Sequence, residues 1–254
     1  MKHELRGQFS VRYRNLIRGR PQWVLSESCN TNIMCGDIFN VISHCETLVI
    51  QLLNRWRTMS CVTIEILKPH QRHLRMNAMS LLRSLHLTNQ EPKLSSTSAG
   101  QEIADFFRRR GLVNTHLALE RFAVARHGDK VVGAAHFFAN SIAINNLLNN
   151  GETANAQMIL NQANLAHLGV GEDYRCQGIG TSLVRATEDE VRSVGFTLLY
   201  GFAEGDAVRL HEFYTTNGFS MGGSGESAPS EIYGDLAPRI APVPRQGEYF
   251  WKKI

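Results

Sequence analysis

The 254-residue sequence lacks the long apolar run that a membrane-spanning helix requires. Its nearest candidate, residues 33–53, carries Asp37, His44 and Glu46 and is too polar for the core of a bilayer. The basic N-terminus is not followed by an apolar segment with a small-residue cleavage site, so we expect no secretory signal peptide. These absences predict a cytoplasmic protein that has no membrane partner.

Cysteine is scarce, and its spacing is not that of a disulfide framework. The number of cysteines is odd and no Cys-x-x-Cys pair occurs, which predicts reduced thiols in a reducing compartment. Clusters of histidine with acidic residues are also absent, so we predict no metal site. The five cysteines are Cys29, Cys35, Cys45, Cys61 and Cys176.

Charge is distributed unevenly along the chain. Residues 1–58 hold eight of the 27 Lys and Arg residues but four of the 23 acidic residues, which leaves nineteen of each sign in residues 59–254. Five arginines lie from Arg6 to Arg20, a density that fits contact with nucleic acid. A solvated, partly disordered extension explains the same pattern. Because Met59 almost directly precedes the first predicted strand, a third hypothesis is that residues 1–58 are an extension without function.

Apolar patterns over residues 59–254 predict a mixed α/β domain. The expected order is strand, helix, helix, strand, strand, insertion, strand, helix, strand, helix, strand, loop, strand. The predicted strands are 61–67, 119–126, 131–138, 165–170, 196–203, one beginning at 218, and an edge strand at 248–253. The predicted helices are 70–87, 101–110, 179–194 and 206–217, with Asp206 as the N-cap of the last one.

Three connecting segments separate these elements. Residues 88–100 are a polar linker, and residues 222–247 are rich in Gly, Pro and Ser and predict a long loop. The insertion at 139–164 contains eight asparagines and has room for one or two short helices, separated by Gly151. It is interpreted as a lid or substrate wall, or alternatively as a surface excursion or a dimer contact.

The most informative segment is a glycine turn, Arg175-Cys176-Gln177-Gly178-Ile179-Gly180, between a strand and a helix. Such a turn leaves N–H groups unpaired at the helix start, where the helix dipole also favours phosphate. A nucleotide-binding P-loop needs a lysine, and none follows Gly180. A dinucleotide-binding fingerprint needs a third glycine where Leu183 stands. The turn by itself therefore fits either a tight turn with no ligand or a phosphorylated small-molecule ligand of another class.

Two further segments flank this turn, Leu168-x-Val170 before it and Phe213-Tyr214-x-x-x-Gly218-Phe219 after it. Together the three segments resemble the GNAT superfamily of acetyl-CoA-dependent N-acetyltransferases, most specifically over residues 165–219. The resemblance implies a GNAT-like acyl-CoA N-acyltransferase fold with splayed central parallel strands, α/β in class with a mixed sheet. It implies transfer of an acetyl group from acetyl-CoA to a primary amine by direct attack in a ternary complex.

The resemblance also implies which residues bind the donor. Backbone groups of Leu168 and Val170 would pair with the pantetheine arm like an added strand, and an amide near Leu168 would polarise the thioester carbonyl. A Cβ at Gly178 or Gly180 would collide with phosphate or restrict the turn. The residues expected to hold the pyrophosphate are Arg175, Cys176, Gln177, Gly178, Ile179 and Gly180, with Thr181 adding a hydroxyl.

Tyr214 matches the family's tyrosine near the CoA sulfur, which implies that it protonates or hydrogen-bonds the departing thiolate. Its spacing from Leu210 and Phe213 equally fits a packing stripe on a helix.

Four residues are candidates for the general base. His167 lies on the strand next to the thioester and has a suitable pKa range. Glu172 at the end of that strand, Glu204 after the neighbouring strand and His136 on the preceding strand are the others. Each also fits a structural role, and a chain of water molecules can replace a single base.

The chain departs from the family pattern at two places. Ala207 stands where many members have asparagine, seven residues before the tyrosine, which removes a hydrogen bond to cofactor or substrate. The insertion at 139–164 replaces a short hairpin and is expected to border the acceptor site. Two alternatives therefore stay open: a non-catalytic acyl-CoA-binding or sensor module, and an acetyltransferase that reaches tRNA or another nucleic acid through residues 1–58. The amine acceptor, small molecule or peptide, is not identified, and a homodimer is possible.

Overall fold

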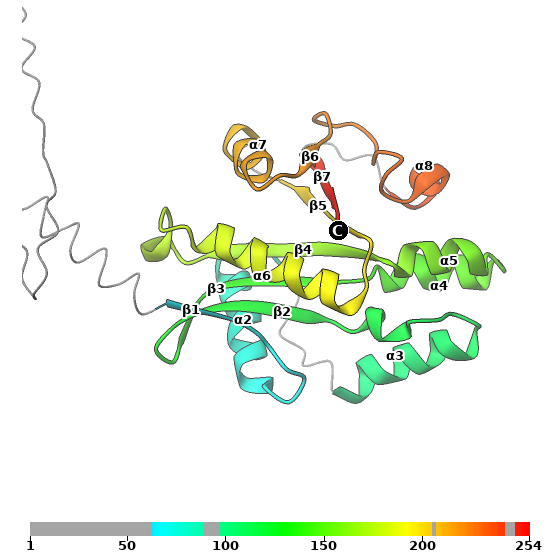
Figure 1. The fold of residues 1–254 in the computed structure, drawn as a ribbon, viewed down its shortest axis with the longest axis horizontal. Helices are drawn as coiled ribbons and strands as arrows, with labels where there is room; N and C mark the ends of the chain where they lie inside the picture. Colours follow the sequence, from blue (N-terminus) through cyan, green and yellow to red (C-terminus); the bar gives the residue numbers. More distant parts are fainter. Residues whose placement is uncertain (1–61, 89–96, 205–206, 242–246) are drawn as a thin grey trace, which may run out of the picture. The chain divides into compact units, whose positions relative to one another are not determined.

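The computed structural model describes residues 62–88, 97–204, 207–241 and 247–254, all within one compact unit, 55–254 (Figure 1). The predictions for residues 1–58 lie outside the described residues. The elements in chain order are β1 (Val62–Ile66), α2 (Arg72–Ser84), α3 (Thr97–Arg109), η1 (Thr115–Ala118), β2 (Arg121–His127), β3 (Lys130–Phe138), α4 (Ser141–Asn149), α5 (Thr153–Leu160), β4 (Gln162–Val170), η2 (Glu172–Tyr174), α6 (Ile179–Val194), β5 (Leu198–Ala203), α7 (Ala207–Thr216), β6 (Ser220–Met221), η3 (Gly234–Leu236), α8 (Ala237–Ile240) and β7 (Glu248–Lys253).

Seven strands form one mixed sheet in the order β1-β2-β3-β4-β5-β7-β6. Only the β4–β5 pair is parallel, and every other neighbouring pair is antiparallel. The predicted mixed α/β class is confirmed. The prediction of β7 as an edge strand is wrong, because Ser220–Met221 pairs with its outer side and encloses it between β5 and β6.

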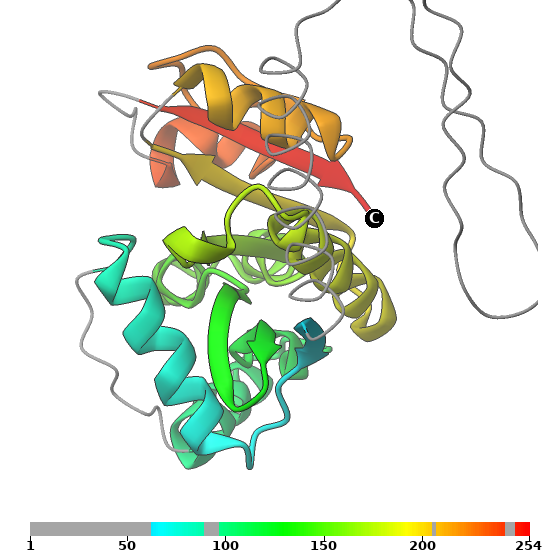
Figure 2. The same ribbon diagram turned by 90° about the vertical axis from the view of Figure 1, so that its left-hand side faces the viewer.

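Helices cover both faces of the sheet (Figures 1 and 2). On one face, Ala78 and Leu82 of α2 join a small apolar cluster with Phe122 and Ala134. Residues buried along one side of α6 cover the other face, as the helical period of 3.6 predicts. Alternate residues of β3 therefore point toward α2 and toward α6 in turn.

The insertion at 139–164 contains two short helices, as predicted, and they form a helical hairpin. Asn140 caps α4 by accepting a hydrogen bond from Ala143 N at 3.1 Å, and Gly151 (φ +75°) separates α4 from α5. The buried sides of both helices belong to the main core. The hairpin lies where β3 ends and β4 begins, at the opposite end of β4 from the glycine turn (Figure 1). β4 starts at Gln162, so the last three residues of the predicted insertion are strand.

The segment predicted as a loop, 222–247, contains η3 and α8, so that prediction is wrong in part. The segment is held by a backbone hydrogen bond from Gly222 N to Tyr249 O of β7, at 2.8 Å, and by side-chain contacts. Arg239 forms a two-armed ion pair with Glu152 at the start of α5, at 2.6 and 3.1 Å. Tyr233 accepts a hydrogen bond from Asn140 at 3.2 Å.

Helix boundaries are predicted unequally well. α6 matches its predicted range residue for residue, because glycines with positive φ end it on both sides. α3 begins at Thr97 within the predicted polar linker, where Gly100 lets the helix approach the Leu119 side chain. The predicted N-cap of α7, Asp206, lies outside the described residues.

Candidate active site

β4 and β5 are hydrogen-bonded over three residue pairs and then separate. Residues 162–164 pair with residues 198–200, whereas the rest of β4 pairs with β3 alone. Gly201 lies next to the point of separation. A Cβ there would overlap the Phe250 ring and lie 2.8 Å from the Leu165 carbonyl oxygen, so glycine permits the close packing at this point. The predicted splay of the two parallel strands is confirmed.

The open part of β4 turns backbone polar groups toward the splay. Gly171 N donates to Val132 O of β3 at 2.8 Å, so its backbone groups point toward β3. Because direction alternates along a strand, those of Leu168 and Val170 point away from β3, where no strand pairs with them. A bulge at Ala166 precedes them in the ladder. An extended ligand has the free edge of β4 available for pairing.

The glycine turn after β4 has the backbone shape of an anion site. Cys176 (φ +58°) and Gly178 (φ +75°) are both left-handed, and the latter is the N-cap of α6. The first N–H groups of α6 have no acceptor within the helix and point into the turn. Gly178 is required by its φ alone, because a Cβ there meets nothing within 4 Å, whereas a Cβ at Gly180 would lie 3.3 Å from the Phe213 ring.

Side chains of the turn brace it. Arg175 Nε donates to the carbonyl oxygen of the last β4 residue at 3.1 Å, and Gln177 Nε2 donates to Asp173 O at 3.1 Å. Cys176 is exposed, and Thr181 is half-buried in the first turn of α6. These contacts engage Arg175 Nε and Gln177 Nε2 within the protein, whereas the first amides of α6 have no acceptor within the helix.

Tyr214 lies on the buried side of α7. Its ring stacks on Phe250, with ring centres 3.7 Å apart, and meets Phe213 and Phe219 edge-on. Burial raises the pKa of the Tyr214 phenol well above its usual value, so the hydroxyl stays protonated and can only donate to an anion. Phe213, the neighbour of Tyr214, lies against Gly180 and so joins α7 to the glycine turn.

Two of the histidine candidates form a pair across β3 and β4. His136 lies opposite His167 in the ladder, and their Nδ1 atoms are 3.2 Å apart. Burial, and then the charges of His167 and Arg75, lower the pKa of His136 to about 3. Burial also lowers the pKa of His167. Both imidazoles are therefore neutral at pH 7, and a neutral imidazole can accept a proton.

The two acidic candidates lie at the surface. Glu172 is exposed in η2 and approaches Arg175 at 3.8 Å. Glu204 is exposed directly after β5. His167 and His136 therefore lie together on the neighbouring strands β4 and β3. Glu172 and Glu204 lie just after the ends of β4 and β5, where these two strands are apart.

A family model described as the acetyltransferase (GNAT) family matches residues 88–219. The chain belongs to the GNAT family. The match contains the splayed strands, the glycine turn and Tyr214. No curated protein matches the chain.

Solved acetyltransferase structures resemble this GNAT chain at low sequence identity. One is the ribosomal-protein-S18-alanine N-acetyltransferase from Escherichia coli, with 14% identity, a TM-score of 0.43, and 76% of this chain and 94% of that chain covered. Another is an acetyltransferase from Streptococcus agalactiae, with 17% identity, a TM-score of 0.43, and 76% and 99% covered. Ard1 from Thermoplasma volcanium has 14% identity and a TM-score of 0.42, with 76% and 98% covered.

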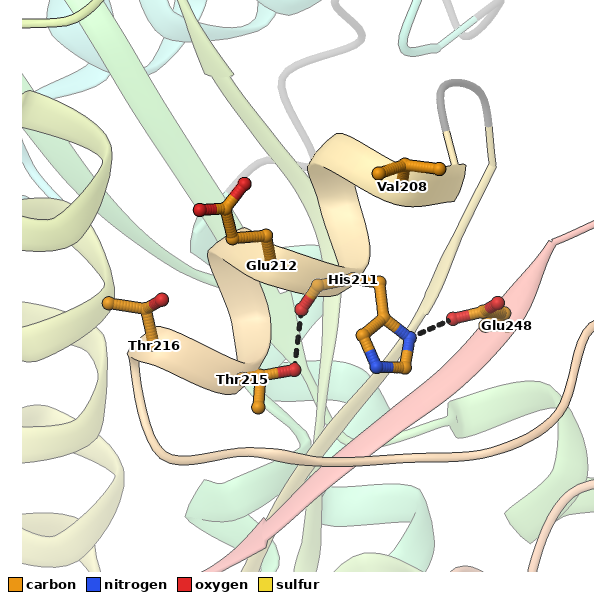
Figure 3. A pocket seen from close by; sticks show the side chains of 6 residues that line it. All are labelled: Val208, His211, Glu212, Thr215, Thr216 and Glu248. Atoms are coloured by element: carbon orange, nitrogen blue, oxygen red, sulfur yellow. Dashed lines mark hydrogen bonds and ion pairs between the residues drawn. The ribbon is translucent and has the colours of Figure 1, made fainter.

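A shallow hollow on the outer side of α7 is a separate feature of this GNAT domain (Figure 3). His211 points across it toward Glu248, with Nδ1 and a carboxylate oxygen 2.8 Å apart, while Glu212 points away. The hollow contains none of the predicted site residues and is not part of the candidate active site. Its lining consists of Val208, His211, Glu212, Thr215, Thr216 and Glu248.

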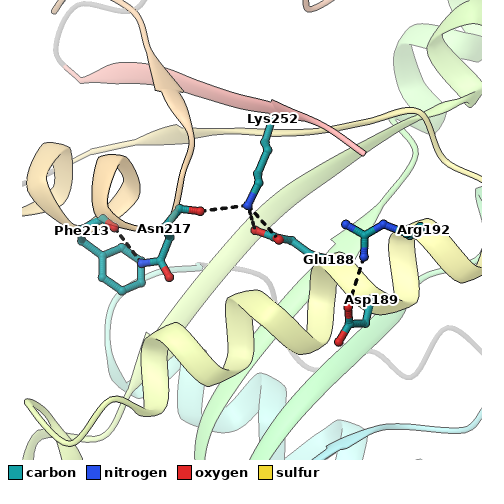
Figure 4. A network of polar contacts seen from close by, with 6 residues as sticks. All are labelled: Glu188, Asp189, Arg192, Phe213, Asn217 and Lys252. Carbon is teal, nitrogen blue, oxygen red and sulfur yellow. Dashed lines mark hydrogen bonds and ion pairs between the residues drawn. The ribbon is translucent and has the colours of Figure 1, made fainter.

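A polar network fixes the two site helices relative to each other (Figure 4). Lys252 of β7 donates to both carboxylate oxygens of Glu188 on α6, at 2.8 and 2.9 Å, and to Asn217 O after α7, at 3.0 Å. The side chains of Lys252 and Glu188 are largely buried, with 28% and 12% of their surfaces exposed, respectively. The network thereby sets the spacing between the helix that begins at the glycine turn and the helix that carries Tyr214.

The described residues hold neither a candidate membrane-spanning helix nor a candidate metal cluster. No helix within 62–88, 97–204, 207–241 and 247–254 combines the length and hydrophobicity needed to cross a bilayer. The same ranges contain no group of three or more His, Cys, Asp or Glu side chains placed to hold a metal ion.

Proposed function

We propose that this GNAT chain is an N-acetyltransferase that moves an acetyl group from acetyl-CoA to a primary amine in a ternary complex. The observation that carries the proposal is the separation of β4 from β5 beside a left-handed glycine turn. A free strand edge and a set of helix-start amides, side by side, suit a ligand with an extended amide arm and a pyrophosphate.

The chain's own groups fit acetyl-CoA at both places. The amides from Gly178 onward face a pyrophosphate at the positive end of the α6 dipole. The free edge at Leu168 and Val170 can pair with the two amides of the pantetheine arm. Bound acetyl-CoA supplies the activated acetyl group. The amide of Leu168 would then face the thioester carbonyl and stabilise the negative charge that develops there.

His167 is the general base in this proposal. A primary amine is largely protonated at pH 7, so one proton must leave before the nitrogen can attack. Burial lowers the pKa of His167 and keeps its imidazole neutral and ready to accept that proton. Glu172 and Glu204 stay alternative predictions for the base.

Tyr214 acts on the leaving group. The raised pKa keeps its hydroxyl protonated, so it donates a hydrogen bond to the sulfur as negative charge develops there. Stacking on Phe250 fixes the direction of the ring.

The deciding experiment is a screen of amine acceptors with acetyl-CoA, with thiol release as the readout. We expect turnover with at least one amine, and Tyr214→Phe, which keeps the stacked ring, should lower kcat about 10- to 100-fold. His167→Ala should lower kcat by a similar factor and leave acetyl-CoA affinity unchanged. Acetyl-CoA binding without turnover on any amine would instead support the acyl-CoA-binding module, the alternative that Ala207 favours.

The nucleic-acid alternative is tested separately, because it depends on residues 1–58. Deleting them should abolish salt-dependent binding of tRNA if that segment makes the contact. If the 59–254 chain fails to fold or to bind acetyl-CoA, the hypothesis that residues 1–58 lack function is wrong.

A further inference from the structure

His136, one of the four candidates for the general base, is buried beside His167 and has no role in the proposed function. Its side chain is 3% exposed, and its ring is stacked on Phe122, with ring centres 4.3 Å apart and planes within 7°. The ring is also parallel to that of His167, with centres 5.5 Å apart. Stacking fixes the plane of His136, so its two nitrogen atoms point in defined directions.

One nitrogen of His136 points at His167 and the other toward an acidic group. Its Nδ1 is 3.2 Å from Nδ1 of His167, a hydrogen-bond distance. Its Nε2 is buried without a hydrogen bond, and Glu120 Oε1 lies 3.9 Å away. Arg75 of α2 approaches the other oxygen of Glu120 at 3.5 Å. Arg75, Glu120 and His167 are the charged or titratable groups identified around the His136 ring.

These distances select one arrangement of ring protons. A bare Nε2 on His136 would face a carboxylate oxygen with its lone pair, which is unfavourable, so Nε2 carries the proton. A neutral ring then has a lone pair at Nδ1, and His167 must donate its Nδ1–H to it. The other nitrogen of His167, Nε2, is left with a lone pair.

We propose that His136 is a positioning residue that holds His167 in the Nδ1–H tautomer, with Nε2 as the basic atom. The proposal rests on the proposed function, in which His167 accepts the proton of the amine. His136 itself takes up no proton. Its role is to accept one hydrogen bond, and the role of Glu120 is to orient the proton on His136.

Two substitutions of His136 separate this role from packing. Phe at position 136 retains an aromatic ring against Phe122 but has no acceptor. Asn places an amide oxygen near the position of Nδ1 and sacrifices the ring. If His136 positions His167, His136→Phe should lower kcat at least about 10-fold, with the KM for acetyl-CoA unchanged, and His136→Asn should retain most of kcat. Packing alone predicts the reverse order, and that outcome would overturn the proposal.

A spectroscopic measurement tests the tautomer without activity. Nitrogen-15 NMR of the histidine rings, with His167 assigned by its loss in His167→Gln, should show a protonated Nδ1 and a bare Nε2 in the unsubstituted protein. His136→Asn should retain this pattern and His136→Phe should change it. An Nε2–H tautomer of His167 in the unsubstituted protein would overturn the proposal, even if His136→Phe does not fold. Failure of the acceptor screen would refute the proposed function and leave this spectrum interpretable.

Discussion

The two ends of β4 differ in how they are held, and the difference separates stability from function. At the end formed by residues 162–164, the closed end, β4 pairs with β5, and at Asn164 it also pairs with β3. From Leu165 to Val170, the open end, it pairs only with β3, and the glycine turn follows. The first residues of β4 therefore pair with β5, whereas the edge of its last residues that faces β5 is unpaired.

Side-chain hydrogen bonds hold the closed end on both faces of the sheet. On the α6 face, Lys252 joins Glu188 and Asn217, and it pairs in register with Leu199. On the other face, Tyr200 meets Tyr233 through a hydroxyl–hydroxyl bond of 2.8 Å. The polar groups of Lys252, Glu188, Tyr200 and Tyr233 are hydrogen-bonded within the protein.

The open end has polar groups in a different condition. The backbone groups of Leu168 and the N–H of Val170 face the splay, whereas Val170 O accepts a hydrogen bond from Arg175 Nε, and the first amides of α6 lack helical partners. His136 Nε2 is buried without a hydrogen bond. The unpaired backbone groups of the open end lie where the substrate is proposed to bind.

The largest effect on stability is expected from the closed end. Lys252→Met leaves the Glu188 carboxylate buried and without its cation, and should lower the free energy of unfolding by about 3 kcal/mol in urea denaturation. Arg192→Met is the matched control. It removes the exposed ion pair with Asp189, 57% and 80% exposed, and should cost less than about 0.5 kcal/mol. Equal losses from the two variants would show that the buried network stabilises the fold no more than an exposed ion pair does.

The next effect belongs to the open end and concerns affinity. Gly178→Asp and Gly178→Asn both accept a left-handed φ and differ in charge alone. Asp should weaken acetyl-CoA binding about 50-fold relative to Asn, equivalent to about 2.3 kcal/mol, because its carboxylate repels the pyrophosphate. Isothermal titration measures the affinity, and urea denaturation should give the two variants equal stability. Equal affinities of the two variants for acetyl-CoA would show that the glycine turn is not the phosphate site.

A smaller loss of stability is expected from the tyrosine pair at the closed end. Tyr233→Phe deprives the buried Tyr200 hydroxyl of its 2.8 Å partner and should cost about 1.5 kcal/mol. Replacing both tyrosines with Phe should cost less than the sum of the single changes, because no hydroxyl is then left without its partner, and the loss of the Asn140 bond to Tyr233 is common to Tyr233→Phe and the double variant. Acetyl-CoA affinity should stay within about threefold in all three variants. An additive double variant would argue against a direct bond.

How far the sequence predicts this molecule depends on whether a feature is local. α6 is predicted to the residue, because its apolar stripe and two flanking glycines are written in consecutive residues. The place of β7 inside the sheet is missed, because it depends on β6, a strand of two residues far away in the chain. The two helices within 139–164 are predicted from the sequence. Their packing into the main core is not, because it depends on contacts with residues far away in the chain.

The same distinction applies to the candidate site. The glycine turn is a candidate because of its local glycine pattern, and Tyr214 is a candidate because of the resemblance to the GNAT superfamily. The partnership of His136 with His167 is not predicted from the sequence, because it depends on the bulge at Ala166. Counting back from Phe138, which pairs with Asn164, an unbroken ladder would set His136 opposite Ala166 rather than His167.

The smallest predicted effect is a pH dependence that distinguishes the open end from the closed one. His136 has a folded pKa of about 3, below the unfolded value of about 6.5, so between these values the unfolded chain binds a proton that the folded chain does not. Its contribution to stability is therefore present above pH 6.5 and is lost as the pH falls toward 3. Between pH 6.5 and 5.5 this loss is about 1 kcal/mol. His136→Asn should be less sensitive to pH by that amount in urea denaturation, whereas Tyr233→Phe should retain the full dependence. If His136→Asn keeps it too, the imidazole of His136 is not held neutral by its burial, and the hydrogen-bond direction inferred for the histidine pair fails with it.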